Sequence, residues 1–359
     1  MDNWKDNIRR VEPYVPGEQP KGENIIKLNT NENPYTPALG VVNALKDLSD
    51  MNGDILRKYP DPDATDIVES LAEYHGVNKE NVFVGVGSDD VLATAFLTFF
   101  NFDKPIIFPD ITYSFYKVWA DVYRIPYEEI PLSEDFTINV ADYNRECGGI
   151  VIANPNAPTG IVMSLDDIEN IIKNNSDVVV IVDEAYIDFG GDSAISLIDK
   201  YENVLVTRTF SKSRSLAGLR LGYSLGSKEL ISAMLDVKFS INSYTINAPT
   251  LICASESIED ESYFRETVAK IIYTREDITR ELESRGFEIL PSSANFIFAK
   301  HGEKSAEFIF EELKKRNIYV RYFKKPRIDN YLRITIGTEE EMMQFLEVID
   351  SIINSFEIW

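Results

Sequence analysis

The chain has 359 residues, 44% of them hydrophobic and 11% aromatic, so it is long and apolar enough to bury a large core. Its formal net charge of −23 would repel nucleic acid phosphates and argues against a nucleic-acid-binding protein. Two cysteines and two histidines, far apart, leave little material for a disulfide framework or a metal site. The N-terminal residues lack signal-peptide character and no apolar run is long enough to span a membrane, so we expect a cytoplasmic protein.

The N-terminal residues 1–35 predict an irregular arm that packs with a small domain, because three prolines fall between Pro13 and Pro20. After the arm, five short apolar runs each end in a small, polar or glycine-containing turn, and a helical pattern follows. The runs lie at 81–90, 104–116, 148–160, 177–186 and 203–212. Continuous Val/Ile segments such as 178–182 are typical of strands buried on both faces of a parallel sheet. We therefore predict an α/β fold, a mostly parallel sheet with helices on both faces, as a large domain over 36–257.

The pattern changes from residue 258. A charged amphipathic helical pattern (263–286) precedes strand-like segments at 295–300, 317–323 and 331–337, and a helical pattern over 338–356 ends the chain. Strands separated by helices predict a smaller α+β domain over 258–359.

Ligands in open α/β sheets bind at the carboxyl ends of the strands, where polar residues follow the five runs. These residues are Ser88, Asp89, Tyr113, 154–160, 183–186, Ser211 and Lys212. Pyridoxal phosphate (PLP) requires an amine to form an imine, a carboxylate for its pyridine nitrogen, a donor for its phenolic oxygen and an anion cradle. Lys212, Asp183 and Tyr186 supply the first three in order.

The phosphate cradle is predicted at the glycine-containing turn 85–90, helped by Thr209, Ser211 and Arg220, and Tyr113 is positioned to stack on a ring. Each residue alone also has an ordinary explanation: a solvated lysine, an ion-paired aspartate or a packed tyrosine. The PLP hypothesis depends on their combination.

Taken together, these segments resemble fold type I PLP-dependent aminotransferases, most closely the histidinol-phosphate aminotransferase branch. The resemblance runs over nearly the whole chain. It is carried by residues 28–37, 57–67, 84–90, 109–116, 153–160, 182–189, 209–223 and 330–338. The most specific motif is "TFSKSRSLAGLRLGY" around Lys212, with "VDEAY" upstream of it.

The resemblance implies a role for each matching residue. Lys212 forms the imine with PLP, Asp183 pairs with the pyridine nitrogen and Tyr186 donates to the phenolic oxygen. The other implied cofactor contacts are Tyr113 on the ring, and Ser88, Asp89, Thr209, Ser211, Arg220 and, from the neighbouring subunit of a homodimer, Tyr59 on the phosphate. The implied substrate-binding residues are Arg333, Arg321, Tyr14 and Asn33.

One position departs from the family pattern. Ala157 stands where the family carries the asparagine that bonds the phenolic oxygen of PLP. This contact is lost or taken over by Asn156, and Tyr186 then carries more of the electron withdrawal at the cofactor.

The resemblance implies transamination of histidinol phosphate with 2-oxoglutarate, which gives imidazole acetol phosphate and glutamate in histidine biosynthesis. Two arginines and a tyrosine are better suited to bind a dianionic group of the substrate than to bind a single carboxylate. Two enzyme alternatives stay open: an aminotransferase for aromatic or other amino acids, and a PLP-dependent decarboxylase of a phosphorylated amino acid. More remote is a non-catalytic PLP-binding regulatory module. An NAD-dependent dehydrogenase is weaker still, because the turn at 85–90 lacks the third glycine of GxGxxG.

Overall fold

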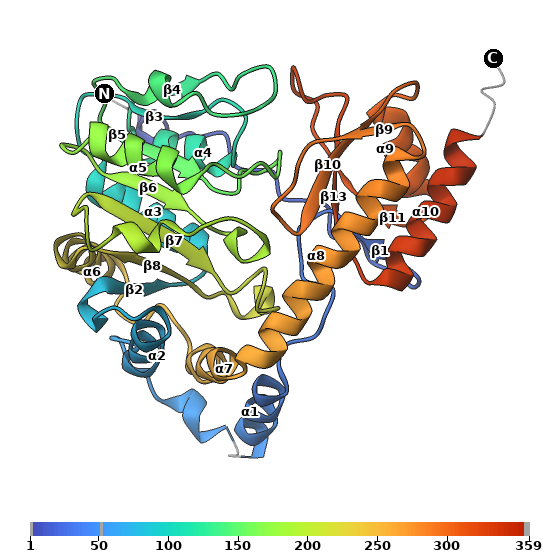
Figure 1. Ribbon diagram of the computed structural model, residues 1–359. Helices are drawn as coiled ribbons and strands as arrows, with labels where there is room; N and C mark the ends of the chain where they lie inside the picture. Colours follow the sequence, from blue (N-terminus) through green and yellow to red (C-terminus); the bar gives the residue numbers. More distant parts are fainter. Residues whose placement is uncertain (1–2, 51–52, 355–359) are drawn as a thin grey trace.

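The computed structural model describes residues 3–50 and 53–354, and a seven-stranded sheet dominates it (Figure 1). The strand order is β2-β8-β7-β6-β5-β3-β4. The strands are β2 (Val82–Gly85), β3 (Ile106–Pro109), β4 (Tyr127–Ile130), β5 (Gly149–Ala153), β6 (Val180–Asp183), β7 (Val204–Thr209) and β8 (Gly222–Gly226). Neighbouring strands from β4 through β3, β5 and β6 to β7 pair in parallel, whereas β8 is antiparallel to both β7 and β2.

Alternate side chains of this sheet enter two apolar cores, one on each face. On β6, for example, Val180 and Val182 join one core and Ile181 joins the other. The first core is covered by α1 (Leu39–Asp50), α2 (Thr65–His75), α5 (Leu165–Asn174) and α7 (Ala248–Glu259). The second is covered by α3 (Ser88–Phe99), α4 (Phe115–Tyr123) and α6 (Lys228–Ile241). The predicted fold class, a mostly parallel sheet with helices on both faces, is confirmed.

A second, four-stranded antiparallel sheet has the order β12-β13-β10-β9. Its strands are β9 (Phe287–Ile289), β10 (Phe296–His301), β12 (Arg321–Tyr322) and β13 (Leu332–Thr335). The helices α8 (Glu261–Glu283), α9 (Ala306–Lys315) and α10 (Glu339–Ile353) pack on it. We call residues 36–259 the large-sheet unit and residues 260–354 the small-sheet unit. In Figure 1, α8 runs from beside α7 up to the small sheet.

The N-terminal arm is tied to the small-sheet unit. Its short strand β1 (Ile26–Lys27) pairs in parallel with β11 (Ile318–Tyr319), and the carbonyl of Leu28 accepts a hydrogen bond from the Thr335 amide. The 3₁₀ helices of the described residues are η1 (Trp4–Asn7), η2 (Asp54–Arg57), η3 (Lys79–Asn81), η4 (Val140–Tyr143), η5 (Ile187–Phe189), η6 (Ala194–Leu197) and η7 (Ala217–Leu219).

Two strands of the large sheet were not predicted. The β8 segment reads Gly-Tyr-Ser-Leu-Gly and has no continuous Val/Ile run, and β4 reads Tyr-Glu-Glu-Ile with both glutamates exposed at the edge of the sheet. The predicted boundary at 257/258 falls inside α7, which ends at Glu259. The predicted C-terminal helix is α10, and its predicted last residues, 355–356, lie outside the described residues.

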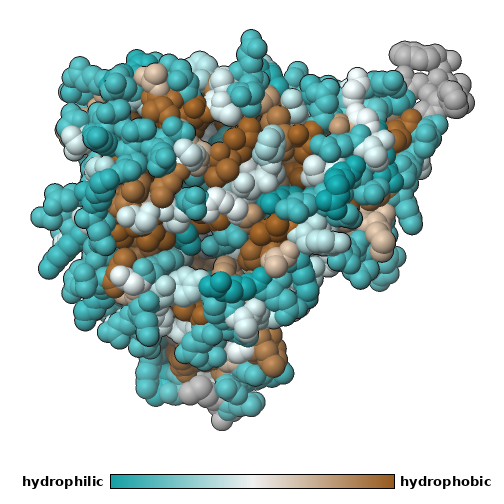
Figure 2. All heavy atoms as spheres, in the orientation of Figure 1, coloured by the Kyte–Doolittle hydropathy of each residue, from teal (hydrophilic) through white to brown (hydrophobic). Residues whose placement is uncertain are grey.

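Parallel pairing brings the ends of β5, β6 and β7 to one edge, because Ala153 is in register with Asp183 and Asp183 with Thr207. The turns that follow these strands therefore lie side by side. The outline of the molecule is mostly hydrophilic, and apolar residues show mainly toward the middle of the view (Figure 2). No helix within 3–50 or 53–354 has the length and apolarity to cross a membrane.

Candidate active site

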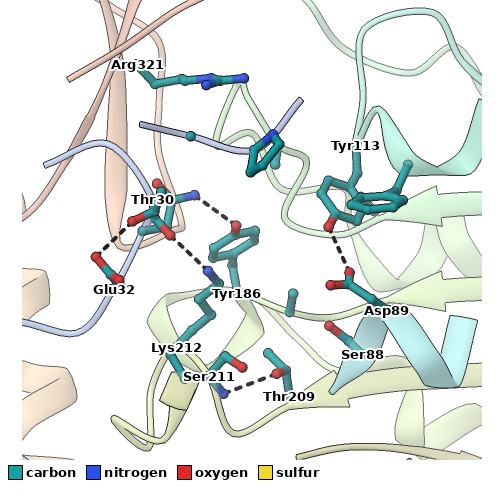
Figure 3. A pocket seen from close by; sticks show the side chains of 18 of the residues that line it. Thr30, Glu32, Ser88, Asp89, Tyr113, Tyr186, Thr209, Ser211, Lys212 and Arg321 are labelled. Atoms are coloured by element: carbon teal, nitrogen blue, oxygen red, sulfur yellow. Dashed lines mark hydrogen bonds between the residues drawn. The ribbon is translucent and has the colours of Figure 1, made fainter. Parts of the chain in front are cut away.

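A cavity of about 460 Å³ opens at this edge of the large sheet, between the two units and beneath the N-terminal arm (Figure 3). The sequence-predicted residues that line it are Tyr14, Ser88, Asp89, Tyr113, Asp183, Tyr186, Thr209, Ser211, Lys212, Arg220, Arg321 and Arg333. Segments far apart in the chain thus meet in one pocket. In Figure 3, Arg321 lies on the opposite side of the pocket from Ser88, Thr209 and Ser211.

Lys212 follows β7 and points into the pocket, where its Nζ donates to the carbonyl of Thr30 at 3.1 Å. Burial, together with the nearby guanidinium of Arg333, lowers the pKa of this amine to about 8. At pH 7 about a tenth of the Lys212 amine is therefore in the neutral, nucleophilic form, far more than for an ordinary lysine.

Asp183 ends β6 and is buried. Its Oδ2 accepts from the hydroxyl of Tyr116 at 2.7 Å and its Oδ1 accepts from the Ala185 amide at 3.2 Å. Burial raises the pKa of Asp183 to about 6, although the hydrogen bond from Tyr116 opposes this shift. Among the described residues, no lysine, arginine or histidine lies within 4.0 Å of this carboxylate, so it is a buried acid without a cationic partner.

Tyr186 lies close to Lys212, whose Nζ is 5.8 Å from the centre of the tyrosine ring. The Tyr186 hydroxyl accepts a hydrogen bond from Asn31 Nδ2 at 2.8 Å, and burial raises the pKa of this hydroxyl. Its ring packs edge-on against Phe296 of β10, so it contacts the small-sheet unit as well.

The turn from β2 into α3 forms an anion cradle. Gly87 precedes α3 at a φ of 85°, and none of the described side chains caps the first turn, so backbone N–H groups stay available at Ser88. Thr209 and Ser211 lie beside this turn in the pocket lining. Arg220 Nη2 lies 3.6 Å from Asp89 Oδ2, and Asp89 Oδ1 accepts from Tyr113 at 2.8 Å. The Asp89 side chain thus orients Tyr113 and Arg220.

The opposite end of the pocket carries two arginines. Arg333 Nη2 donates to the Asn29 carbonyl at 3.0 Å, while its Nε is buried without a partner among the described residues. Arg321 Nη2 donates to the carbonyl of Val15 in the arm at 3.3 Å. Tyr14, also in the arm, stacks on Phe115 with ring centres 4.2 Å apart and lines the pocket. The two guanidiniums make this end a site for an anionic group.

Three predicted site residues do not line the cavity. Asn33 donates instead to the backbone carbonyls of Lys212 and Ser213, both at 3.1 Å, so its predicted substrate contact is not supported. Asn156 is bonded to Ile111, Thr112 and Thr159.

Both N–H groups and the oxygen of the Asn156 amide are therefore bonded to the protein itself, and its replacement of the missing asparagine stays a prediction. Ala157 lines the pocket without a polar atom in its side chain. Tyr59 lies outside the cavity, is 81% exposed and stacks on Tyr244.

Sequence reasoning missed several residues that bond the predicted ones, among them Tyr116 to Asp183, Asn31 to Tyr186 and the Thr30 carbonyl to Lys212. Asn31 and Thr30 belong to a motif that carried the family resemblance, but nothing in their spacing from Lys212 indicated contact. Tyr116 ends the segment 109–116 that also carried the resemblance, three residues after Tyr113, and this proximity was the available signal.

Comparison with known proteins places the chain in a family. The model of the aminotransferase class I and II family matches residues 23–349. The chain belongs to this aminotransferase family. Histidinol-phosphate aminotransferase 1 from Hydrogenovibrio crunogenus is 54% identical over 352 residues, 98% of each chain, and histidinol-phosphate aminotransferase from Clostridium botulinum (strain Okra / Type B1) is 52% identical over 351 residues, also 98% of each.

The aminotransferase fold is also found in solved structures. Histidinol-phosphate aminotransferase from Sinorhizobium meliloti, solved in complex with pyridoxal-5'-phosphate, superposes with a TM-score of 0.84 at 24% identity, over 92% of this chain and 90% of that one. This likeness supports the fold of the aminotransferase.

Proposed function

We propose that this aminotransferase transfers the amino group of histidinol phosphate to 2-oxoglutarate with PLP as cofactor, a step of histidine biosynthesis. One observation carries the proposal: a chain 54% identical to a histidinol-phosphate aminotransferase brings a half-buried lysine, a buried carboxylate and two arginines into one cavity. The small-molecule substrates fit a cavity of about 460 Å³.

The groups of the pocket that lack an oppositely charged side chain among the described residues fit PLP. Asp183 is a buried acid that a protonated pyridine nitrogen would neutralise, and Lys212 is an amine of lowered pKa that suits reaction with an aldehyde. The open first turn of α3 suits a phosphate. In this proposal the phosphate is held by Ser88, Asp89, Thr209, Ser211 and Arg220, the ring by Tyr113 and Asp183, and the phenolic oxygen by Tyr186.

When bound, PLP supplies an electron sink for negative charge that develops at the substrate Cα. The neutral amine of Lys212 would take the proton from the substrate Cα as general base and, as the ammonium, would deliver it to the aldehyde-derived carbon of the cofactor and not back to the Cα, as amino transfer requires. The hydrogen bond from the Tyr116 hydroxyl favours the ionised form of Asp183. The Asp183 carboxylate would then stabilise the positive charge of the protonated pyridine nitrogen. Arg333 and Arg321 bind the distal anion of the substrate and fix its reactive carbon near Lys212. Tyr14 of the arm restricts water at this end of the pocket.

The proposal includes a homodimer in which Tyr59 reaches the phosphate of the neighbouring active site. Tyr59 and Tyr244 form an exposed aromatic stack with ring centres 4.5 Å apart. The exposed apolar side chains Leu56 and Ile241 lie close to them in the sequence. Such a surface suits burial against a second copy. The division into domains at 36–257 and 258–359 is part of this proposal, and a cytoplasmic location stays a prediction.

The test is an absorbance titration of the purified protein with PLP. Histidinol phosphate should convert the bound cofactor to its aminated form, 2-oxoglutarate should restore it, and Lys212→Ala should abolish both. Phenylalanine serves as the comparison substrate. Equal conversion by phenylalanine would indicate an aromatic aminotransferase, release of carbon dioxide a decarboxylase, and cofactor binding without conversion a regulatory module.

A further inference from the structure

Arg275, in the middle of α8, is a buried charge held only by backbone carbonyls. The residue is 8% exposed, and its Nη1 donates to the carbonyl of Phe189 at 3.0 Å and to that of Ala294 at 2.8 Å. No acidic side chain of the described residues forms a salt bridge with it, and burial lowers its pKa. Burying a guanidinium carries a desolvation penalty, and an apolar side chain would avoid it. A role in positioning the two carbonyl segments would explain why a guanidinium is buried here.

The two carbonyls belong to different units. Phe189 ends η5 in the large-sheet unit, three residues after Tyr186. Ala294 belongs to the small-sheet unit, in the loop 290–295 that joins β9 to β10. Arg275 thus links the Tyr186 segment to this loop through a single nitrogen atom. In Figure 1, α8 runs from beside α7 up to the small sheet. The two hydrogen bonds of Arg275 place its guanidinium where the two units meet.

The loop 290–295 fits closely against two glycine turns of the large-sheet unit. The Ser293 amide donates to the Gly160 carbonyl at 2.8 Å. A Cβ at Gly160 would come within 2.6 Å of Ser292, and one at Gly190 within 3.1 Å of Ser293. Both glycines have positive φ, so any larger residue would be strained as well as crowded. The loop therefore has little freedom to slide over the large-sheet unit.

The same loop leads into the substrate end of the pocket. Phe296, two residues after Ala294, has its ring centre 5.1 Å from that of Tyr186, and the guanidinium of Arg333 lies 5.4 Å from the centre of the Phe296 ring. Asn295 Nδ2 donates to the carbonyl of Asn31, whose own side chain bonds Tyr186. Where this loop sits therefore decides where Arg333 lies relative to Tyr186 and Lys212.

We propose that Arg275 is a positioning residue that clamps the loop 290–295 onto the Tyr186 segment and so sets the distance between the anion-binding arginines and Lys212. Its effect falls on the substrate and not on the cofactor. The residues proposed to hold PLP all belong to the large-sheet unit, whereas Arg333 and Arg321 belong to the small-sheet unit and move with the loop. This inference rests on the function proposed above.

The test compares Arg275→Met with Arg280→Met in the full-length holoenzyme. Arg280 lies on the same helix, is exposed and pairs with Asp277, so its removal controls for the loss of a positive charge from α8. In Arg275→Met we expect the KM for histidinol phosphate to rise about 10-fold, because displaced anion-binding arginines would hold the substrate anion poorly. The Kd for PLP should change less than 2-fold. Hydrogen exchange should speed up at the Ser293 amide. Arg280→Met should match the wild type in all three measurements.

An unchanged KM in Arg275→Met would overturn the proposal, and so would parallel losses of cofactor and substrate affinity, which indicate general destabilisation. If Arg275→Met does not fold, Arg275→Lys is measured by the same criteria, because a single ammonium cannot reproduce the guanidinium geometry. A wild-type enzyme that converts no histidinol phosphate would reject the proposed function instead. The hydrogen exchange at Ser293 then still tests the clamp.

Discussion

Burial moves the pKa of Asp183 and of Lys212 toward neutrality from opposite sides, to about 6 and about 8. Both groups are desolvated, and neither has an oppositely charged side chain in direct contact among the described residues. Without a ligand, such groups lower the stability of the folded protein, because burying an uncompensated charge is unfavourable. At residue scale, the pocket is therefore organised for a ligand that brings its own charges and a reactive carbonyl.

The pKa of Lys212 has a kinetic consequence. The neutral amine is the form that reacts with an aldehyde, and its fraction rises with pH through about 8. We predict that the rate constant for PLP uptake by the apoprotein rises about 10-fold from pH 7 to pH 9 and then levels off. Stopped-flow absorbance measures it. Arg333→Met should shift the midpoint to higher pH, because the guanidinium of Arg333 lowers this pKa; a rate independent of pH would contradict the prediction.

Tyr116 controls the charge of Asp183. Its hydroxyl donates to Asp183 Oδ2 and lowers the pKa of this carboxyl, so Tyr116→Phe should raise the pKa and leave more of the acid neutral near pH 6.5. We expect PLP affinity to fall about 10-fold at pH 6.5, as for a lost hydrogen bond to a charged group, and less at pH 8.5. Fluorescence titration at both pH values measures the change.

The matched control is Tyr143→Phe, since the buried hydroxyl of Tyr143 has no hydrogen-bond partner among the described residues. It should bind PLP as the wild type does. Equal affinities for Tyr116→Phe and wild type at both pH values would show that this hydroxyl does not act on Asp183.

At the scale of elements, the cradle depends on how closely β8 approaches the turn between β2 and α3. A Cβ at Gly222 of β8 would lie 2.3 Å from the Ser88 backbone nitrogen, and a Cβ at Gly87 would lie 2.5 Å from Arg220 Nη2. The glycines that make β8 hard to recognise in the sequence are thus the residues that let it pack here. Glycine therefore accounts both for the weak strand pattern of β8 in the sequence and for its close packing against the turn between β2 and α3.

Gly87→Ala tests this close approach. The added methyl group should displace the guanidinium of Arg220 from the cradle, and we expect the Kd for PLP to rise about 10-fold. Gly76→Ala is the control, because Gly76 also has positive φ but its Cβ would meet no atom within 4 Å. Gly76 is in the αL region, at φ 67° and ψ 33°, so Gly76→Ala adds modest strain and no clash, whereas Gly87, at φ 85° and ψ 164°, adds both. An unchanged Kd in Gly87→Ala would contradict the prediction.

At the scale of the whole molecule, the pocket needs three parts of the chain. The large-sheet unit carries Lys212 and Asp183, the small-sheet unit carries Arg333, and the arm carries Tyr14. Tyr59 does not line the pocket in the single chain, where it is exposed and stacks on Tyr244. A complete site in our proposal therefore requires a second copy.

Hybrid dimers test this requirement. Mixing Lys212→Ala with Tyr59→Phe subunits, after dissociation and reassociation, forms hybrids in which one site combines an intact Lys212 with an intact Tyr59 from the partner. We predict that PLP affinity and turnover of the mixture exceed the sum of the separate variants. Activity equal to that sum would show that Tyr59 acts within its own subunit, or not at all.

The sequence by itself determined the five buried strands, the helices between them, the edge of the sheet where the site lies and twelve of its lining residues, because Val/Ile runs and the turns after them are local signals. Only the tertiary structure decided the rest. Asn33 and Asn156 turned away from the pocket because nearer backbone and side-chain groups take up their amides. The roles of Tyr116, Asn31 and Arg275 come from contacts with distant parts of the chain. Their partners lie 67, 155 and up to 86 positions away in the sequence, respectively. Such contacts depend on how the two units pack, and no local pattern in the chain encodes that packing.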